Sequence, residues 1–277
     1  MKRNGTHEPT IERIIELSGI ETLHPGGMAM TRRTGEVAGL IVGMHVLDVS
    51  SGRGTQAIYY AQQYGVDVTG VDISDEMVRT ASRSAARAGV ADRVRFRQGD
   101  SQRLPFESGT FDVVINECAV GIPDDSQAVL DEMLRVVRPG GAVVIHESTW
   151  RAPATATEKE ELAERYGTTP LDGTAWVEML GRAGAGDVHV ESDPWSRPEM
   201  FWNVRVDRSV RGPGAVLTPI EKARTAVRVA RRFGLAGVRK AFENERAFYR
   251  AVLDGKLGYA LYWGRRPARQ GETSEQR

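Results

Sequence analysis

One short segment constrains this chain more than any other: an apolar strand that runs into a glycine loop and then into a helix. The strand is His45–Val49, the loop is Ser50–Gly54, and a helix-like stretch extends from Thr55 to about Tyr64. Glycines let a backbone approach a ligand closely, and the carboxyl edge of a parallel sheet opens on a crevice. The segment therefore predicts a cofactor site at the end of the first strand of an α/β sheet.

The chain goes on alternating between apolar strands and helical segments as far as about residue 150. The five strands predicted there are His45–Val49, Val66–Val71, Val94–Gln98, Phe111–Ile115 and Ala142–Ile145. The fourth has no polar face, which is typical of a strand covered on both sides. With two further strands at 187–191 and 258–264, the pattern predicts a Rossmann-like, doubly wound, mostly parallel sheet of seven strands.

The regions around this core predict four parts. Residues 1–40 are expected to hold an amphipathic helix near Ile11 and a Leu-His-Pro-Gly-Gly loop that together form a lid. Residues 41–194 are the expected cofactor-binding core, and 195–257 a helical insertion on the acceptor side. Residues 258–277 give the last strand and a polar tail. Thr218-Pro219-Ile220-Glu221 is a helix start signal within the insertion.

Composition excludes several classes of protein. The 277 residues carry 37 basic and 37 acidic side chains, so no net field favours nucleic acid or an anionic membrane. A single cysteine, Cys118, excludes an internal disulfide and a cysteine-based zinc cluster, and no metal site is expected. No apolar run is long enough to cross a bilayer, and the first residues do not resemble a secretion signal. We expect a cytoplasmic protein.

Two ligand classes fit the glycine loop when it is followed by Asp72, an acid able to bind a ribose: a dinucleotide or S-adenosylmethionine. Five segments in order decide between them, because together they resemble the class I S-adenosylmethionine-dependent methyltransferases. The segments are Val46–Thr55, Gly70–Ser74 with Met77, Gln98–Ser101 with Leu104–Phe106, Phe111–Val114, and Arg135–Gly141. The layout most resembles the small-molecule O-, N- and C-methyltransferases that act on sugars, sterols and quinones.

This resemblance implies roles for individual residues. Asp48 would hold the methionine amino group, Asp72 the ribose, and Ile73 with Met77 the adenine, whose edge would meet Asp100 and Ser101. The remaining residues expected to bind the cofactor are Ser50, Gly52, Gly54, Thr55 and Asn116. The family usually has glycine where this chain has Ser50. S-Adenosyl-L-methionine is the expected cofactor, and S-adenosyl-L-homocysteine its product.

Methyl transfer needs an aligned nucleophile, and it needs a general base only if the acceptor atom is protonated. In the sugar O-methylating relatives a histidine pair follows an acid on the fourth strand, and a second acid ends the fifth. Glu117 and Glu147 match the two acids, but Val120 and Gly121 replace the histidines. Three alternatives follow: His24 serves as the base, Glu147 does, or the acceptor needs none. The candidate catalytic residues are therefore Glu147, His24 and Glu117.

The expected acceptor is a small molecule, aromatic or anionic, because tryptophans and basic helices follow residue 150. Those tryptophans and their neighbours are Trp150, Trp176, Trp195, Met200, Phe201 and Trp202. No nucleic acid or membrane partner is expected, and a homodimer is left open. Three alternatives are a non-methylating use of bound S-adenosylmethionine, an RNA or protein methyltransferase, and a NAD-dependent reductase.

Overall fold

The computed structural model describes residues 14, 17–18, 24–166, 170–201 and 219–268. The predicted helix residue Ile11, the predicted helix cap Thr218 and the aromatic residue Trp202 lie outside these ranges. The chain divides into two compact units. The first contains residues 1–30, 148–172 and 192–260, and the second contains 31–147, 173–191 and 261–277. The four-part functional division expected from the sequence stays a prediction.

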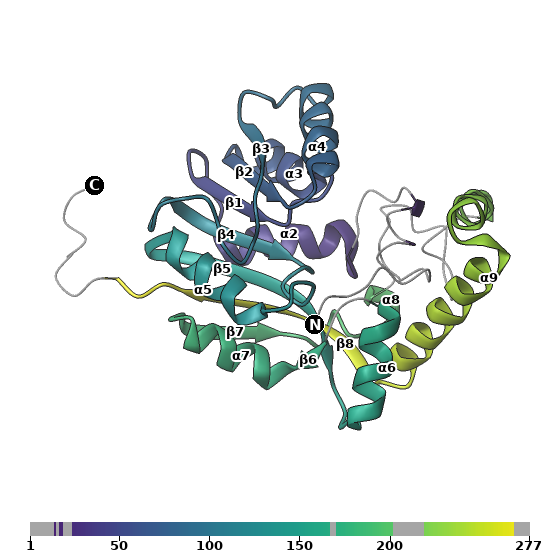
Figure 1. Ribbon diagram of the computed structural model, residues 1–277. Coiled ribbons are helices and arrows are strands. Elements are labelled where there is room, and N and C mark those ends of the chain that lie inside the picture. The colour runs from purple at the N-terminus through teal and green to yellow at the C-terminus, as the bar shows by residue number, and fades with distance from the viewer. Residues whose placement is uncertain (1–13, 15–16, 19–23, 167–169, 202–218, 269–277) are drawn as a thin grey trace. The chain divides into compact units, whose positions relative to one another are not determined.

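The sheet has the strand order β3-β2-β1-β4-β5-β8-β7, and the short β6 pairs with β5 (Figure 1). The strands are β1 His45–Val49, β2 Asp67–Asp72, β3 Val94–Gln98, β4 Phe111–Glu117, β5 Val137–Trp150, β6 Leu171–Asp172, β7 Gly186–Glu191 and β8 Leu257–Arg265. The strands β3, β2, β1, β4 and β5 run parallel to one another, and β7 is antiparallel to β8. The predicted Rossmann-like fold is confirmed, with β6 as an additional strand of two residues.

Eight helices are described. They are α2 Gly27–Ala38, α3 Thr55–Tyr64, α4 Asp75–Arg87, α5 Ser126–Val136, α6 Ala156–Tyr166, α7 Gly173–Arg182, α8 Pro198–Phe201 and α9 Pro219–Leu253. Helix α2 begins inside the segment expected to be a loop. Helix α9 is broken at Gly234, whose backbone φ of 70° is not helical.

The strand order places a topological switch between β1 and β4. From β1 the chain adds β2 and β3 on one side, and it then crosses back to add β4 and β5 on the other. Loops leaving two such strands in opposite directions open a crevice at the carboxyl edge of a parallel sheet. The glycine loop that follows β1 lies at this point.

Local sequence explains why the elements next to this crevice form. Four consecutive residues of β4, Val113–Asn116, are buried, as a strand between two covered faces requires. Helix α4 begins at Ser74, whose side chain accepts the Met77 N–H at 3.3 Å, and acidic residues occupy its first turn. Helix α5 begins in the same way at Asp125, which accepts the Ala128 N–H at 3.0 Å.

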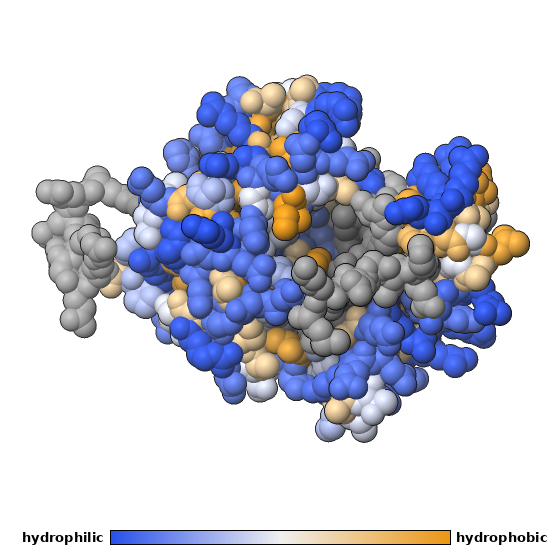
Figure 2. Space-filling model, viewed as in Figure 1, coloured by the Kyte–Doolittle hydropathy of each residue, from blue (hydrophilic) through white to orange (hydrophobic). Residues whose placement is uncertain are grey.

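The first unit holds α6, α8, α9 and β6. Lys256 pairs with Glu158 at 2.6 Å, and Arg151 pairs with Asp193 at 3.0 Å. Trp195 is buried, whereas Leu235 on α9 is exposed. In Figure 2 the α9 region shows hydrophilic and hydrophobic patches side by side. Within the described ranges, no helix has both the length and the hydropathy needed to span a membrane.

Candidate cofactor and active site

The loop after β1 is fixed to β2 by its backbone. The Ser51 N–H donates to the Val71 carbonyl at 2.9 Å, and the Gly52 N–H donates to the Asp72 carboxylate at 2.9 Å. Ser50 has a φ of 61°, in the left-handed region that favours glycine. The substitution noted in the sequence therefore leaves a strained residue at the start of the loop.

Two glycines of this region have no room for a side chain. A Cβ on Gly54 would lie 2.9 Å from Cε1 of Phe96, and a Cβ on Gly70 would lie 2.6 Å from the same atom. Gly54 also has a φ of 78°, where it precedes α3. The aromatic ring thus holds the loop and β2 close together.

Asp72 organises the end of β2. Its Oδ2 accepts the Gly52 N–H, and its Oδ1 accepts the Ser74 N–H at 2.8 Å. Each carboxylate oxygen has two lone pairs, so both can accept a further hydrogen bond. Ile73, the next residue, has 69% of its surface exposed although it is apolar. An acid able to accept two hydroxyls and an exposed aliphatic side chain beside it suit a nucleoside.

Asp48 is a buried acid whose Oδ2 has no hydrogen-bond partner among the described residues. Burial raises the pKa of this carboxyl well above its ordinary value, and the negative charges of Glu117 and Asp72 raise it further. An unpartnered acid oxygen next to two other acids is stabilised by a cation. An amino group is a ligand of that kind.

The other predicted cofactor residues are more scattered. Met77 and Thr55 are half-buried in the first turns of α4 and α3. Asp100 is exposed and accepts the Gln102 N–H at 2.9 Å, whereas Ser101 is buried. Asn116 pairs in register with Val49, so it faces away from Asp48, and its Oδ1 accepts the Ala119 N–H at 2.9 Å. The structure brings Asp48, Asp72 and the loop together more closely than these five residues.

Glu117, at the end of β4, accepts hydrogen bonds from side chains of two helices. Its Oε1 accepts the hydroxyl of Tyr60 from α3, and its Oε2 accepts the hydroxyl of Thr31 from α2 at 2.8 Å. Only 4% of the Glu117 side chain is exposed. Burial, together with the charge and the hydrogen bond of Glu117, raises the pKa of Tyr60 well above its ordinary value. Tyr60 therefore stays protonated and acts as a donor.

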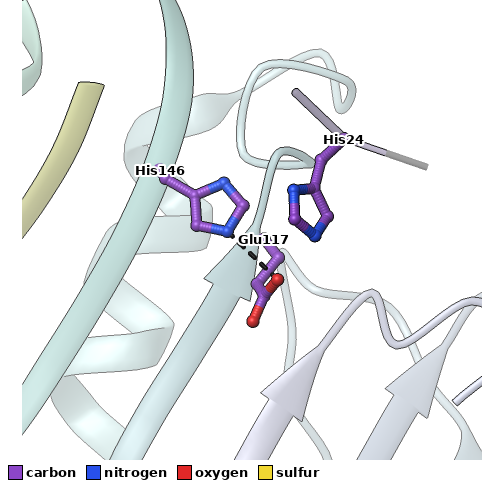
Figure 3. A group of neighbouring side chains, drawn as sticks. All are labelled: His24, Glu117 and His146. Atoms are coloured by element: carbon purple, nitrogen blue, oxygen red, sulfur yellow. Dashed lines mark ion pairs between the residues drawn. The ribbon is translucent and has the colours of Figure 1, made fainter. Parts of the chain in front are cut away.

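His146 of β5 is the polar neighbour that the sequence argument did not select. Its Nε2 lies 3.1 Å from Oε2 of Glu117, and the ring is fully buried (Figure 3). The two residues are direct register partners on parallel strands, so their side chains point to the same face. The strands predicted from the sequence end at Ile115 and Ile145, so Glu117 and His146 lie beyond both of them.

Glu147, the next residue on β5, faces the other way. Its Oε1 accepts the N–H groups of Val120 at 2.6 Å and Gly121 at 3.3 Å. These are the positions at which the related enzymes were expected to carry a histidine pair. The carboxylate therefore organises the backbone of the loop after β4. Its role as a base stays a prediction.

His24 belongs to the first unit, whereas Glu117 and Glu147 belong to the second. The ring of His24 is buried, and its Nδ1 lies 2.9 Å from the carbonyl oxygen of Pro25, immediately before α2. This placement is local to the turn. The predicted catalytic role of His24 stays a prediction.

The residues of the second unit fit S-adenosylmethionine. The unpartnered Oδ2 of Asp48 can take the amino group, the spare acceptor capacity of Asp72 can take the ribose, and the exposed Ile73 can cover the adenine. The acidic surroundings also suit a ligand that carries a positive charge. A dinucleotide, whose diphosphate is negatively charged, suits this row of acids less well.

Comparison with known proteins agrees with this fit. Residues 46–141 match a family described as a methyltransferase domain. An arsenite methyltransferase from Halobacterium salinarum is 38% identical over 118 residues, which are 42% of this chain and 30% of that protein. The match thus spans less than a third of that relative.

Solved structures share the fold over most of the chain. The [4+2]-cyclase SpnF has a TM-score of 0.72 and 20% identity, covering 96% of this chain and all of that one. A geranyl diphosphate methyltransferase in complex with S-adenosylmethionine has a TM-score of 0.65 and 21% identity, covering 86% of this chain and 84% of that one. Such low identities show the fold alone. The family match therefore identifies residues 46–141 as a methyltransferase domain, and the geometry of the glycine loop fits S-adenosylmethionine as its methyl donor.

Proposed function

We propose that the protein transfers a methyl group from S-adenosylmethionine to a small-molecule acceptor. The observation that carries the proposal is the buried carboxylate of Asp48 beside the switch between β1 and β4, whose Oδ2 has no hydrogen-bond partner among the described residues. The cofactor supplies a methyl group on a sulfonium, which an aligned nucleophile displaces in line. The protein must position S-adenosylmethionine and the acceptor next to each other and exclude water from the site.

The contacts of Asp48, Asp72 and the glycine loop support the following proposed cofactor roles. Asp48 binds the amino group, and the Ser50–Thr55 backbone surrounds the methionine and the ribose. Asp72 binds the ribose hydroxyls. Ile73 and Met77 enclose the adenine, whose edge meets Asp100 and Ser101, and Asn116 contributes from the end of β4. Ser50 shifts the loop slightly relative to a glycine at that position.

Two arguments favour a small acceptor. The similar proteins named above act on arsenite and geranyl diphosphate by their names, and both are small. The carboxyl ends of β4 and β5 are also almost fully buried, with Glu117 and His146 sharing one enclosed face. Arsenite itself is not proposed, because the chain has one cysteine and a soft metalloid requires several thiolates. An aromatic or anionic metabolite is the proposed class.

The proton chemistry of the transfer is part of the proposal. Glu117 and Glu147 lie on opposite faces at the ends of β4 and β5, and both already accept hydrogen bonds. His24 is the third candidate. If the acceptor is a hydroxyl, one of these three takes its proton; a free amine or an activated carbon requires none of them.

A non-methylating use of the cofactor is the second candidate. It is favoured by one observation: a likeness that covers 96% of this chain is to a protein named as a [4+2]-cyclase. The two candidates differ in whether S-adenosylhomocysteine is released.

The test uses methyl-labelled S-adenosylmethionine, the purified protein and a size-fractionated extract of its source. Label in the small-molecule fraction, absent with the Asp48→Asn variant, supports the proposal. Label in RNA or protein overturns the small-molecule acceptor. Tight cofactor binding without release of S-adenosylhomocysteine in any fraction favours the non-methylating use instead.

A further inference from the structure

Three acids and a histidine share one face at the carboxyl edge of the sheet. Asp48 on β1 is level with Gly70 on β2 and with Ile115 on β4. Side chains alternate along a strand, so Asp72 and Glu117, each two residues further on, point to the same face as Asp48. His146 is the register partner of Glu117 and continues the row onto β5.

Glu117 is the most firmly held member of this row. Its carboxylate accepts hydrogen bonds from hydroxyl groups on α3 and α2. The ring of His146 lies next to the same carboxylate (Figure 3). Hydroxyl donors fix the position of a carboxylate that accepts from them. The structure therefore holds the Glu117 carboxylate at one place at the end of β4, where its neighbours restrict its rotation.

The charge of this carboxylate acts on the cofactor-binding acid. The negative charge of Glu117 is the second cause, after burial, of the raised pKa of Asp48. Two acids that repel each other in a buried place are both stabilised when a cationic ligand enters. A ligand with more positive charge gains more from the pair than a ligand with less.

S-Adenosylmethionine and S-adenosylhomocysteine differ by one methyl group and one positive charge at sulfur. They share the amino group, the ribose and the adenine, so the contributions of Asp48 to the amino group and of Asp72 to the ribose are common to both. We propose that Glu117 is the residue by which this protein distinguishes the charged cofactor from its uncharged product. Loss of the sulfonium charge during transfer then weakens binding of the product and assists its release.

His146 completes the arrangement as the positioning partner of Glu117. Within the second unit, Tyr60 from α3 donates its hydroxyl to Glu117, and Asp48 from β1 is close enough for its charge and that of Glu117 to interact. The Tyr60 and Thr31 hydroxyls can also accept hydrogen bonds, so an amide in place of the carboxylate keeps its partners. Glu117→Gln is therefore a charge change with little change of shape.

The test is a calorimetric titration of the cofactor-free protein with S-adenosylmethionine, S-adenosylhomocysteine and sinefungin, which carries an amine in place of the sulfonium. The readout is two ratios: the affinity for S-adenosylmethionine divided by that for S-adenosylhomocysteine, and the affinity for sinefungin divided by that for S-adenosylhomocysteine. In Glu117→Gln both ratios are expected to fall about tenfold, the size of one charge interaction in a partly polar interior. Binding of S-adenosylhomocysteine is expected to stay within about threefold, which also shows that the variant is folded.

Two further variants complete the experiment. Asp112→Asn removes a negative charge from the opposite end of the same strand, where Asp112 pairs with Arg138, and should leave both ratios unchanged. Glu117→Asp keeps the charge but withdraws it by one methylene, and should give ratios between those of wild type and Glu117→Gln. Unchanged ratios in whichever of the two Glu117 variants folds overturn the proposal. An equal loss of affinity for all three ligands also overturns it, because that result indicates a purely structural role. The inference rests on the proposed cofactor site, but none of these readouts requires the methyl acceptor, so its failure is distinguishable from failure of the proposed methyl transfer.

Discussion

The Glu147 carboxylate accepts the Val120 N–H at 2.6 Å, so a polar residue of β5 fixes the loop that follows β4. Glu147→Ala leaves two buried N–H groups without an acceptor, and we expect the free energy of unfolding to fall by about 2–4 kcal/mol. Glu147→Gln keeps an acceptor oxygen and should cost about 1 kcal/mol. Denaturant titration measures both changes.

The same pair of variants tests the proposed base. If Glu147 takes the acceptor proton, Glu147→Gln loses methyl transfer to the labelled product about a hundredfold or more while it stays folded. If Glu147 only holds the loop, transfer by the glutamine variant stays near that of the wild type, and the catalytic role is withdrawn.

Ser50 provides a prediction about strain. Its φ of 61° costs about 1 kcal/mol for a residue with a Cβ, and glycine adopts the same conformation freely. We expect Ser50→Gly to raise the free energy of unfolding by about 0.5 kcal/mol, after allowance for the greater freedom of glycine in the unfolded chain. Ser50→Ala keeps the Cβ and serves as the control. A glycine variant that is no more stable than the alanine variant contradicts the strain argument.

Asp48 predicts an unusual dependence of stability on pH. Its folded pKa is raised above the ordinary value of 3.8, so its contribution to stability is fully present below pH 3.8 and is lost as the pH rises through the folded pKa. In the cofactor-free protein at pH 7, Asp48→Asn should therefore raise the free energy of unfolding by about 1–2 kcal/mol. The gain should shrink as the pH falls towards 4. Thermal unfolding across this range measures it.

The same variant should lose its ligand. Asp48→Asn is expected to weaken S-adenosylmethionine binding at least about thirtyfold, because the amino group loses its charged partner. A variant that is more stable than wild type but binds S-adenosylmethionine more weakly shows that Asp48 serves cofactor binding and lowers the stability of the fold. Unchanged affinity contradicts the proposed role of Asp48.

Glu158 shows the opposite pH behaviour in the first unit. Lys256 and the N–H and hydroxyl of Thr155 lower the pKa of Glu158 from 4.5 to about 2. The stabilisation is therefore present above pH 4.5 and is lost as the pH falls through about 2. Glu158→Gln should lower the Tm slightly at neutral pH, and the difference from wild type should vanish near pH 2. A difference that grows as the pH falls would contradict this assignment.

The sequence predicted those parts of the fold that local patterns control. Strands His45–Val49 and Val94–Gln98 lie where predicted, because apolar runs bounded by turn residues define them. Helix α2 was missed because its first residue, Gly27, follows Pro25 and Gly26, which are typical of a loop. Its position depends instead on distant contacts, such as the bidentate binding of Glu191 by Arg33 and the Thr31 hydrogen bond.

The candidate site was predictable to the same extent. The loop and Asp72 follow from one contiguous pattern. The pairing of His146 with Glu117 depends on the register of two strands, and the contact with Tyr60 on how α3 lies over them. Register and helix placement are decided by packing across many residues, so no local pattern contains them. The opposite orientations of His146 and Glu147 follow from alternation along the strand, but which of the two faces Glu117 depends on the register.

The ring of Phe96 occupies the space that the missing side chains of Gly54 and Gly70 leave open. The residues at these three positions, on different elements, therefore occupy one volume. Which substitution is tolerated at one position depends on the residues at the other two. A larger residue at either glycine is tolerated only after the ring has become smaller, and a smaller ring first passes through an underfilled intermediate. Related sequences that have changed here should have done so in that order. The same substitution at Gly70 should then be tolerated in one relative and should destabilise the fold in another.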